Sequence, residues 1–479
     1  MPRFSNQIHI DLSSVLAIVK SNRQRRSLLV GFLVTLLLVL WQHRDNIRAP
    51  SQLPADVIQG VEGRFLKENP SGGPPNVLPM APSLPLPGED KVPMVTVTTF
   101  PLSPVSSPQP SEPTAPPVPA VDDLSASYVQ AILNLSDTTF PRMTCPDSIG
   151  ARYDSLRHKP GGKIKYLMAL NLYEVAPLLL RLMGTIIEVI KFLGPEHCAL
   201  SVVEGRSTDH TLEILEGLRP QLAKIGARYF LDTSSIDPLK EGTDRIVGLS
   251  ALRNMALAPL TEHSDLFDPD TIITFSNDVA SCPDDILELL YQHRYQGAAM
   301  TCAFDWICDG ACFYDVWVSR SMVGNTFFEI PSDVSWAYHD ILFWDDPLSR
   351  DRFGRFQPLQ VYSCWGGMVT LDAKVFVAQK IQFRASRDGE CYMGEPMTLA
   401  KDMWAYGMGR IAAIPLVNVG YSNEEGEQVK QRKGYVSDHV NTSRPADEPQ
   451  TDKIEWQTNP PGQLKCLPSF ENPSWFLPV

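Results

Sequence analysis

Short apolar segments of strand length alternate with longer amphipathic segments of helix length from residue 163 to residue 304, and this alternation restricts the possible folds most strongly. Strands that alternate with helices at this spacing predict a doubly wound, mostly parallel α/β sheet with helices on both faces. In such a sheet the ligand binds at the carboxyl ends of the strands. We expect strands at 163–171, 199–204, 228–232, 271–276 and 298–304, and helices at 174–193, 211–225, 245–257 and 284–295.

The amino-terminal region predicts a membrane anchor. Residues 1–26 are basic, and residues 27–42 form an uncharged apolar run that contains Trp41. A helix of this length covers roughly 24 Å, which suits the thinner membranes of the early secretory pathway. Because the positive charges precede the run, we expect a cytosolic tail, a transmembrane signal anchor and a lumenal head. A cleaved signal peptide is the alternative, although no small-residue cleavage site follows Trp41.

Proline marks the next region of the chain. Of 41 prolines, 18 fall between Pro50 and Pro119, where aromatic residues are few. Such a stretch cannot bury enough apolar surface to fold and acts as an extended spacer, so residues 43–125 are expected to be a disordered stem. We expect a catalytic domain at 126–422 and a polar carboxyl-terminal tail at 423–479. The net charge of −13 argues against a nucleic-acid partner.

The cysteines favour disulfides over a metal site. The chain has nine cysteines and no paired CxxC motifs, which argues against structural zinc. In an oxidising lumen some of them would pair, with Cys302, Cys308 and Cys312 as the leading candidates, and the odd number leaves at least one without an intramolecular partner. The connectivity is open. Sequons at Asn134 and Asn441 fit a lumenal glycoprotein.

Two segments suggest a nucleotide site. The strand that ends at Glu204 runs into a polar turn with Asp209, where a carboxylate can accept hydrogen bonds from a base or ribose. The alternative is that Thr208 or Asp209 only caps the next helix. Arg253 lies on the helix expected at 245–257 and can pair with a diphosphate through its planar guanidinium, although a surface ion pair is the simpler reading of Arg245.

The strand end Ser276-Asn277-Asp278 suggests a cation site. An apolar strand stops abruptly there, and a new helix is expected after Pro283. Mn²⁺ and Mg²⁺ prefer oxygen ligands and often take only one or two carboxylates together with phosphate oxygens. The alternative is that Asp278 merely ends the strand.

The later half of the head suggests a sugar site and its catalytic acids. Tryptophan faces beside carboxylates are typical of sugar sites, and glycines let the backbone approach a ligand closely. The candidate pocket residues are Asp305, Trp306, Trp365 and Gly366. The candidate acids are Glu395, then Glu390 and Asp402, each of which has a purely structural role as its alternative.

The chain resembles one known family through a set of segments and their order. These segments are EGRSTDHT, LRNMALAPL, FSNDV, FYDVWVSR, CWGGM and FRASRDGEC, followed by Glu395 and KDMW. The family is the fungal α-1,3-mannosyltransferase family associated with capsule synthesis, glycosyltransferase family 69, and the resemblance covers about residues 140–421. It implies a GT-A-like fold, GDP-mannose as donor, an α-mannoside acceptor, Mn²⁺ or Mg²⁺ as cation, and an α-1,3 linkage formed with retention. It also implies a single-pass type II protein of the Golgi membrane with its head in the lumen, and leaves open a complex with other glycosyltransferases.

The resemblance also implies residue roles. The nucleotide sugar would be bound by Glu204, Asp209, Arg253 and Asn277. Asp278 would be the last residue of the DxD-type metal motif. Glu395 would activate the acceptor or stabilise an oxocarbenium ion. Ser276 stands where the first Asp of that motif would be, so metal binding would need a ligand from elsewhere. The alternatives are another nucleotide sugar on the same fold, or a non-catalytic scaffold for polysaccharide synthesis or export.

Overall fold

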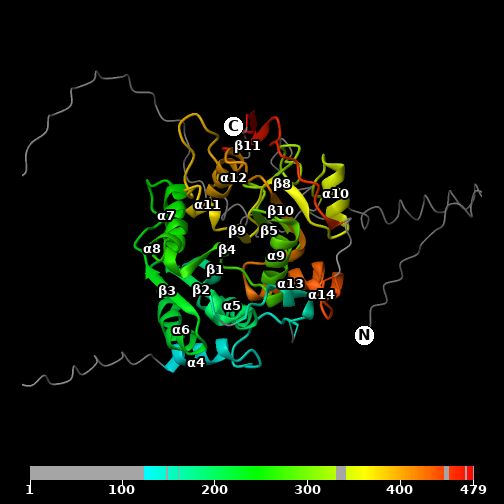
Figure 1. Cartoon of the computed structure of the whole chain (residues 1–479). Helices are drawn as coiled ribbons and strands as arrows, with labels where there is room; N and C mark the ends of the chain where they lie inside the picture. The colour runs from blue at the N-terminus through cyan, green and yellow to red at the C-terminus, as the bar shows by residue number, and fades with distance from the viewer. Residues whose placement is uncertain are drawn as a thin grey trace, which may run out of the picture. The chain divides into compact units, whose positions relative to one another are not determined.

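The computed structural model describes residues 123–146, 149–159, 161–330, 341–446, 452–469 and 472–477 (Figure 1). The expected cytosolic tail, the signal anchor and nearly all of the stem lie outside these residues. Within the described part of the chain, no helix is both long and apolar enough to cross a membrane.

The alternation of strands and helices predicted from the sequence is confirmed, with boundaries that differ by a few residues. The strands of this part are β1 (Ile164–Leu172), β2 (Cys198–Glu204), β3 (Arg228–Thr233), β4 (Phe267–Ser276) and β5 (Met300–Ile307). The helices are α4 (Asp123–Leu133), α5 (Ala176–Leu193), α6 (Thr211–Ile225), α7 (Arg245–Leu257), α8 (Pro259–Glu262) and α9 (Pro283–Gln296).

The less regular second half completes the sheet. Its strands are β6 (Cys312–Phe313), β7 (Arg320–Ser321), β8 (Leu359–Ser363), β9 (Met368–Asp372) and β10 (Ile411–Val419). Its helices are α10 (Pro347–Gly354), α11 (Lys374–Val377) and α12 (Glu395–Ala405).

The strands form one mixed sheet in the order β3-β2-β1-β4-β9-β5-β10-β8-β7, with β6 paired to β5. Strands β1 to β4 are parallel to one another, and β5 is parallel to β10. Strand β9 runs antiparallel between β4 and β5, so β4 and β5 point the same way. The carboxyl ends of these six strands therefore share one edge of the sheet, which is where the candidate site lies.

Each face of the sheet packs against its own hydrophobic core, as a doubly wound fold requires. Along β1, Tyr166 and Met168 belong to the core beneath α4, α5, α6 and α9. Leu167 and Ala169 alternate with them and belong to the core beneath α7 and α12. This alternation follows from the two-residue period of a strand, and burial on both faces explains why the strands are almost wholly apolar.

The chain after residue 422, expected from the sequence to be a polar tail, contains further elements. These are α13 (Asn423–Lys433), α14 (Val436–His439), β11 (Leu464–Cys466) and β12 (Ser474–Phe476). Lys430 of α13 forms an ion pair with Asp285 of α9 at 2.7 Å, and both side chains are only 1% exposed. Polar residues dominate α13, but this charged contact, which a hydrophobic pattern does not reveal, docks it onto the fold.

Eight of the nine cysteines are paired. Their disulfides are Cys145–Cys282, Cys302–Cys364, Cys308–Cys312 and Cys391–Cys466, which confirms the expectation that the cysteines at 302, 308 and 312 are paired. Cys198 is the free, buried thiol.

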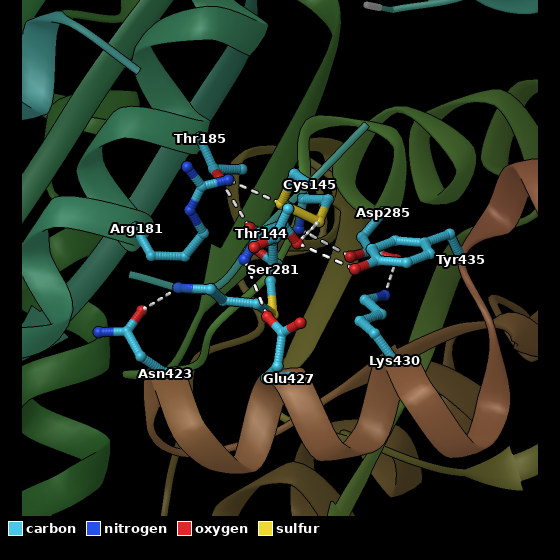
Figure 2. Close-up of a disulfide and its surroundings, with 12 residues drawn as sticks. Thr144, Cys145, Arg181, Thr185, Ser281, Asp285, Asn423, Glu427, Lys430 and Tyr435 are labelled. Carbon is cyan, nitrogen blue, oxygen red and sulfur yellow. Dashed lines mark hydrogen bonds and ion pairs between the residues drawn. A yellow bond between two sulfur atoms is a disulfide. The ribbon is translucent and has the colours of Figure 1, made fainter. Parts of the chain in front are cut away.

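Figure 2 shows the Cys145–Cys282 disulfide joining the segment before β1 to the start of α9, beside Arg181 of α5 and Lys430 of α13. The Thr144 backbone amide donates to Glu427 of α13 at 2.9 Å. The disulfide and these polar contacts therefore hold four segments, distant in sequence, at one place.

Candidate active site

The expected nucleotide and metal residues gather where the parallel strands end. Glu204 is the last residue of β2, and Asn277 and Asp278 follow Ser276, the last residue of β4. Both strands flank β1, whose Leu172 pairs with Glu204 and whose Leu170 pairs with Ser276. The register therefore places Glu204 and the 276–278 turn on either side of one strand end.

Arg253 is the centre of a buried polar cluster at this edge. Its Nε donates to Glu395 Oε1 at 2.7 Å, and the two side chains are 7% and 3% exposed. Its Nη1 lies 3.4 Å from Asn277 Oδ1, and its guanidinium carbon lies 4.0 Å from the centre of the Trp365 ring. Trp365 Nε1 donates to the same Asn277 oxygen at 3.1 Å. The structure thus joins four of the predicted site residues in one cluster.

Glu395 owes its position to the start of α12. It is the first residue of that helix, after Gly394, where a carboxylate also interacts favourably with the helix dipole. Its contact with Arg253 joins α12 to α7 across the edge of the sheet. The catalytic role expected for Glu395 stays a prediction, and the contact itself describes a carboxylate that holds an arginine.

Glu390 and Asp402 lie together, but in a different cluster. Both bind Arg384, at 2.6 Å from Glu390 and 2.7 Å from Asp402, and Lys401 adds a contact to Glu390 at 2.9 Å. The hydrogen bond from Arg384 lowers the pKa of Glu390 to about 2. A carboxylate with that pKa is a poor proton acceptor near neutral pH. These contacts favour the structural alternative for the pair, and their catalytic roles stay predictions.

The loops after β1 and β2 hold each other in place. Glu204, buried at the end of β2, accepts the Ser207 amide at 2.7 Å. Glu174 accepts the Thr208 amide at 2.6 Å. Asp209 accepts the Ala176 amide at the start of α5 at 2.8 Å and also contacts Thr211, the first residue of α6. Asp209 therefore accepts the first amide of each of two helices, and its expected role at the nucleotide stays a prediction.

The pocket residues expected around β5 are buried. Trp306 donates to Asn418 at 2.8 Å inside the core and is only 1% exposed. Gly366 adopts a left-handed φ of +62°, and a Cβ there would lie 1.9 Å from the Ala303 carbonyl oxygen. Its missing side chain therefore lets β5 lie close to this position, and the expected place of Gly366 in a ligand pocket stays a prediction.

Asp305, also fully buried, belongs to a hydrogen-bonded network that the sequence did not reveal. It accepts the Tyr421 hydroxyl at 2.5 Å and the Asp315 amide at 3.2 Å. Burial, and then the charge of Asp305, raises the pKa of Tyr421 well above its ordinary value. Asp315 accepts the Gly366 amide at 2.8 Å. Asp315 lies inside the segment FYDVWVSR, but nothing in that pattern distinguishes it from an ordinary turn residue.

Among the described residues, the end of β4 suits a cation that takes part of its coordination from a ligand. Asp278 is partly exposed just beyond the buried Ser276. The described residues bring no three Asp, Glu, His or Cys side chains together in a metal-binding group. A cation that takes one carboxylate and several phosphate oxygens fits this arrangement.

Comparison with known proteins gives one family. Residues 165–402 match the family described as Cryptococcal mannosyltransferase 1. The alpha-1,3-mannosyltransferase CMT1 of Cryptococcus neoformans is 34% identical over 332 residues, which is 66% of this chain and 70% of that protein.

The similarities to solved structures are weak. The mannosyltransferase PcManGT from Pyrobaculum calidifontis, in complex with GDP-Man and Mn²⁺, is 13% identical, with a TM-score of 0.32 over 62% of this chain and 63% of that chain. TarS 1–349 of S. aureus, in complex with UDP, is 11% identical, with a TM-score of 0.33 over 56% of this chain and 64% of that chain. At these TM-scores neither structure assigns a fold or a ligand to this protein.

Proposed function

Because the chain belongs to the Cryptococcal mannosyltransferase 1 family and is a glycosyltransferase, we propose that it transfers mannose from GDP-mannose to an α-mannoside, forming an α-1,3 linkage with retention. In this reaction the bond between the anomeric carbon and the GDP oxygen breaks, and the acceptor hydroxyl oxygen bonds to that carbon. GDP leaves, and the hydroxyl proton passes to it or to a carboxylate. The observation that carries the proposal is the 34% identity with CMT1 over 332 residues, together with the family match over residues 165–402, a range that contains the Arg253 cluster.

The Arg253 cluster supports a donor site. The Arg253 guanidinium is held on three sides, by Glu395, Asn277 and the face of Trp365. It has therefore lost most of its conformational freedom before any ligand binds. A preorganised arginine at the carboxyl ends of parallel strands suits a diphosphate. Glu204, which lies on the other side of β1 from Asn277, would face the base or ribose.

Asp278 would hold the Mn²⁺ or Mg²⁺ ion, with phosphate oxygens of the donor as further ligands. When bound, such an ion neutralises charge on the departing diphosphate. Because Ser276 replaces a second carboxylate, the ion and the nucleotide should bind in a mutually dependent way.

The basic residues before the apolar run at 27–42 and the two sequons support a type II Golgi protein with its head in the lumen. Four disulfides fit an oxidising compartment.

Titration calorimetry with the purified full chain tests the donor site. We expect GDP to bind with Mn²⁺ and more weakly without it, and UDP to bind more weakly than GDP. Asp278→Asn should remove the Mn²⁺ dependence, whereas Asp351→Asn, a matched change at an exposed ion pair on α10, should not. Tighter binding of UDP would point to another nucleotide sugar, and failure to bind any nucleotide would favour a non-catalytic scaffold.

A further inference from the structure

We propose that Asp315 is a positioning residue of the donor site: it fixes the turn Trp365–Gly367 and, through that turn, the side chain of Asn277. Asp315 contacts the turn through the Gly366 amide, and the Gly367 carbonyl of the same turn accepts the Asn277 amide. The consequence for donor binding rests on the function proposed above. The hydrogen bonds that connect Asp315 to Asn277 through the turn do not depend on that function.

The turn is held by contacts that leave it little freedom. Gly366 and Gly367 have left-handed φ values of +62° and +74°. The Cys302–Cys364 disulfide ties the residue before Trp365 to β5, and Gly366 packs against the carbonyl of Ala303 on the same strand. The Gly366 amide points to Asp315 Oδ2, at 2.8 Å. A hydrogen bond to a carboxylate is stronger than one to a neutral acceptor, so Asp315 is suited to hold this conformation.

The turn contacts Asn277 twice. The Asn277 backbone amide donates to the Gly367 carbonyl at 2.8 Å. The Trp365 indole donates to the Asn277 side-chain oxygen at 3.1 Å, and Arg253 approaches the same oxygen at 3.4 Å. A shift of the turn would therefore move both ends of Asn277 and the ring beneath Arg253.

Asp315 is itself held in place by hydrogen bonds that lead to β5 and to the end of β10. Its backbone amide donates to Asp305 at 3.2 Å, and its carbonyl accepts the Ser319 hydroxyl at 2.7 Å. The other oxygen of Asp305 accepts the hydroxyl of Tyr421, which follows β10. A continuous set of contacts thus runs from Tyr421 through Asp305 and Asp315 to the turn, and from there to Asn277 at the end of β4.

Amide hydrogen exchange on the full chain, without nucleotide, tests the linkage. Asp315→Ala should speed exchange at Gly366, which loses its acceptor, and also at Asn277, whose acceptor is the Gly367 carbonyl, by about tenfold each. Asp315→Asn keeps an oxygen for the Gly366 amide and should restore most of the protection at both positions. Asp351→Ala is the matched control and should change neither. Unchanged exchange at Asn277 in a folded Asp315→Ala protein would overturn the proposal.

A milder change keeps the test decisive if Asp315→Ala does not fold. Tyr421→Phe removes one hydroxyl from Asp305 and leaves the ring, so we expect exchange at Asn277 to quicken about threefold. Exchange at the wild-type rate in this variant would contradict the continuous linkage.

A double-mutant cycle on GDP affinity tests the consequence for the donor site. Asp315→Ala alone should weaken GDP binding about tenfold, and it should add little in an Asn277→Ala background, because both changes release the same contacts. Losses that multiply would show that Asp315 acts by another route. Failure of the wild-type protein to bind GDP would instead contradict the proposed function, and the exchange result would still decide the linkage.

Discussion

Loss of the Glu395 carboxylate should strongly destabilise the protein. The ion pair with Arg253 is 2.7 Å long, and its side chains are 7% and 3% exposed. Among the described residues, Glu395→Ala would leave the buried guanidinium with the Asn277 oxygen at 3.4 Å and aromatic faces around it. Breaking one partner of a buried pair costs about 3–5 kcal/mol, most of it from the charge left uncompensated. We expect the free energy of unfolding to fall by that amount.

Removal of both charges should lower the free energy of unfolding less than removal of one. Arg253→Met combined with Glu395→Leu replaces the pair by apolar side chains, which leaves no buried charge. Urea unfolding with the disulfides intact, followed by fluorescence and circular dichroism, measures the free energy of unfolding of wild type, Arg253→Met, Glu395→Leu and the double variant. Asp351→Ala, at an exposed ion pair on α10, is the control and should change stability by less than about 0.5 kcal/mol. A Glu395→Ala variant as stable as wild type, or a double variant that loses the sum of the two single losses, would refute this reasoning.

Three further predictions concern other parts of the fold. Burial raises the pKa of Asp284 from 3.8 to about 7, so Asp284 keeps a proton in the folded protein that it releases in the unfolded chain. The free energy of unfolding should therefore fall by up to about 1.4 kcal/mol per pH unit as the pH rises between these two values. Asp284→Asn should flatten this dependence when unfolding is measured from pH 4 to 8. Burial also raises the pKa of the Cys198 thiol, so iodoacetamide should not label the native protein. After denaturation without reductant, mass spectrometry should show one added group, and labelling of the native protein would contradict the buried position of Cys198. Gly366→Ala should cost at least about 3 kcal/mol in urea unfolding, because a Cβ would lie 1.9 Å from the Ala303 oxygen in a left-handed conformation, and a loss below 1 kcal/mol would show that the turn can move.

The elements were predictable because their signals are local. The helix at 211–225 and the helix at 245–257 coincide with α6 and α7, since apolar spacing and flanking turn residues define a helix within the segment itself. Helix α13 was not predictable in this way: most of its residues are polar, and it docks through Val429, which reaches the core, and through the buried ion pair between Lys430 and Asp285, residues far apart in sequence.

For the candidate site, the residue types at the strand ends can be read from the sequence, whereas their contacts cannot. Sequence reasoning placed Arg253 and Asn277 in one nucleotide site, and the structure brings them together. It could not show that Glu395 pairs with Arg253, or that Glu390 pairs with Arg384, because a carboxylate expected to act in catalysis and one that holds an arginine look the same in a sequence. Only the tertiary partner distinguishes them.

The most direct test of the central claim is the product of the reaction. The purified full chain is incubated with GDP-mannose, Mn²⁺ and a panel of α-mannosides, and the product linkage is determined by nuclear magnetic resonance. We expect a mannosyl product with an α-1,3 bond, formed in step with GDP release and lost in Asp278→Asn but not in Asp351→Asn. A β-linked product, transfer only from another nucleotide sugar, or equal turnover in Asp278→Asn would contradict it.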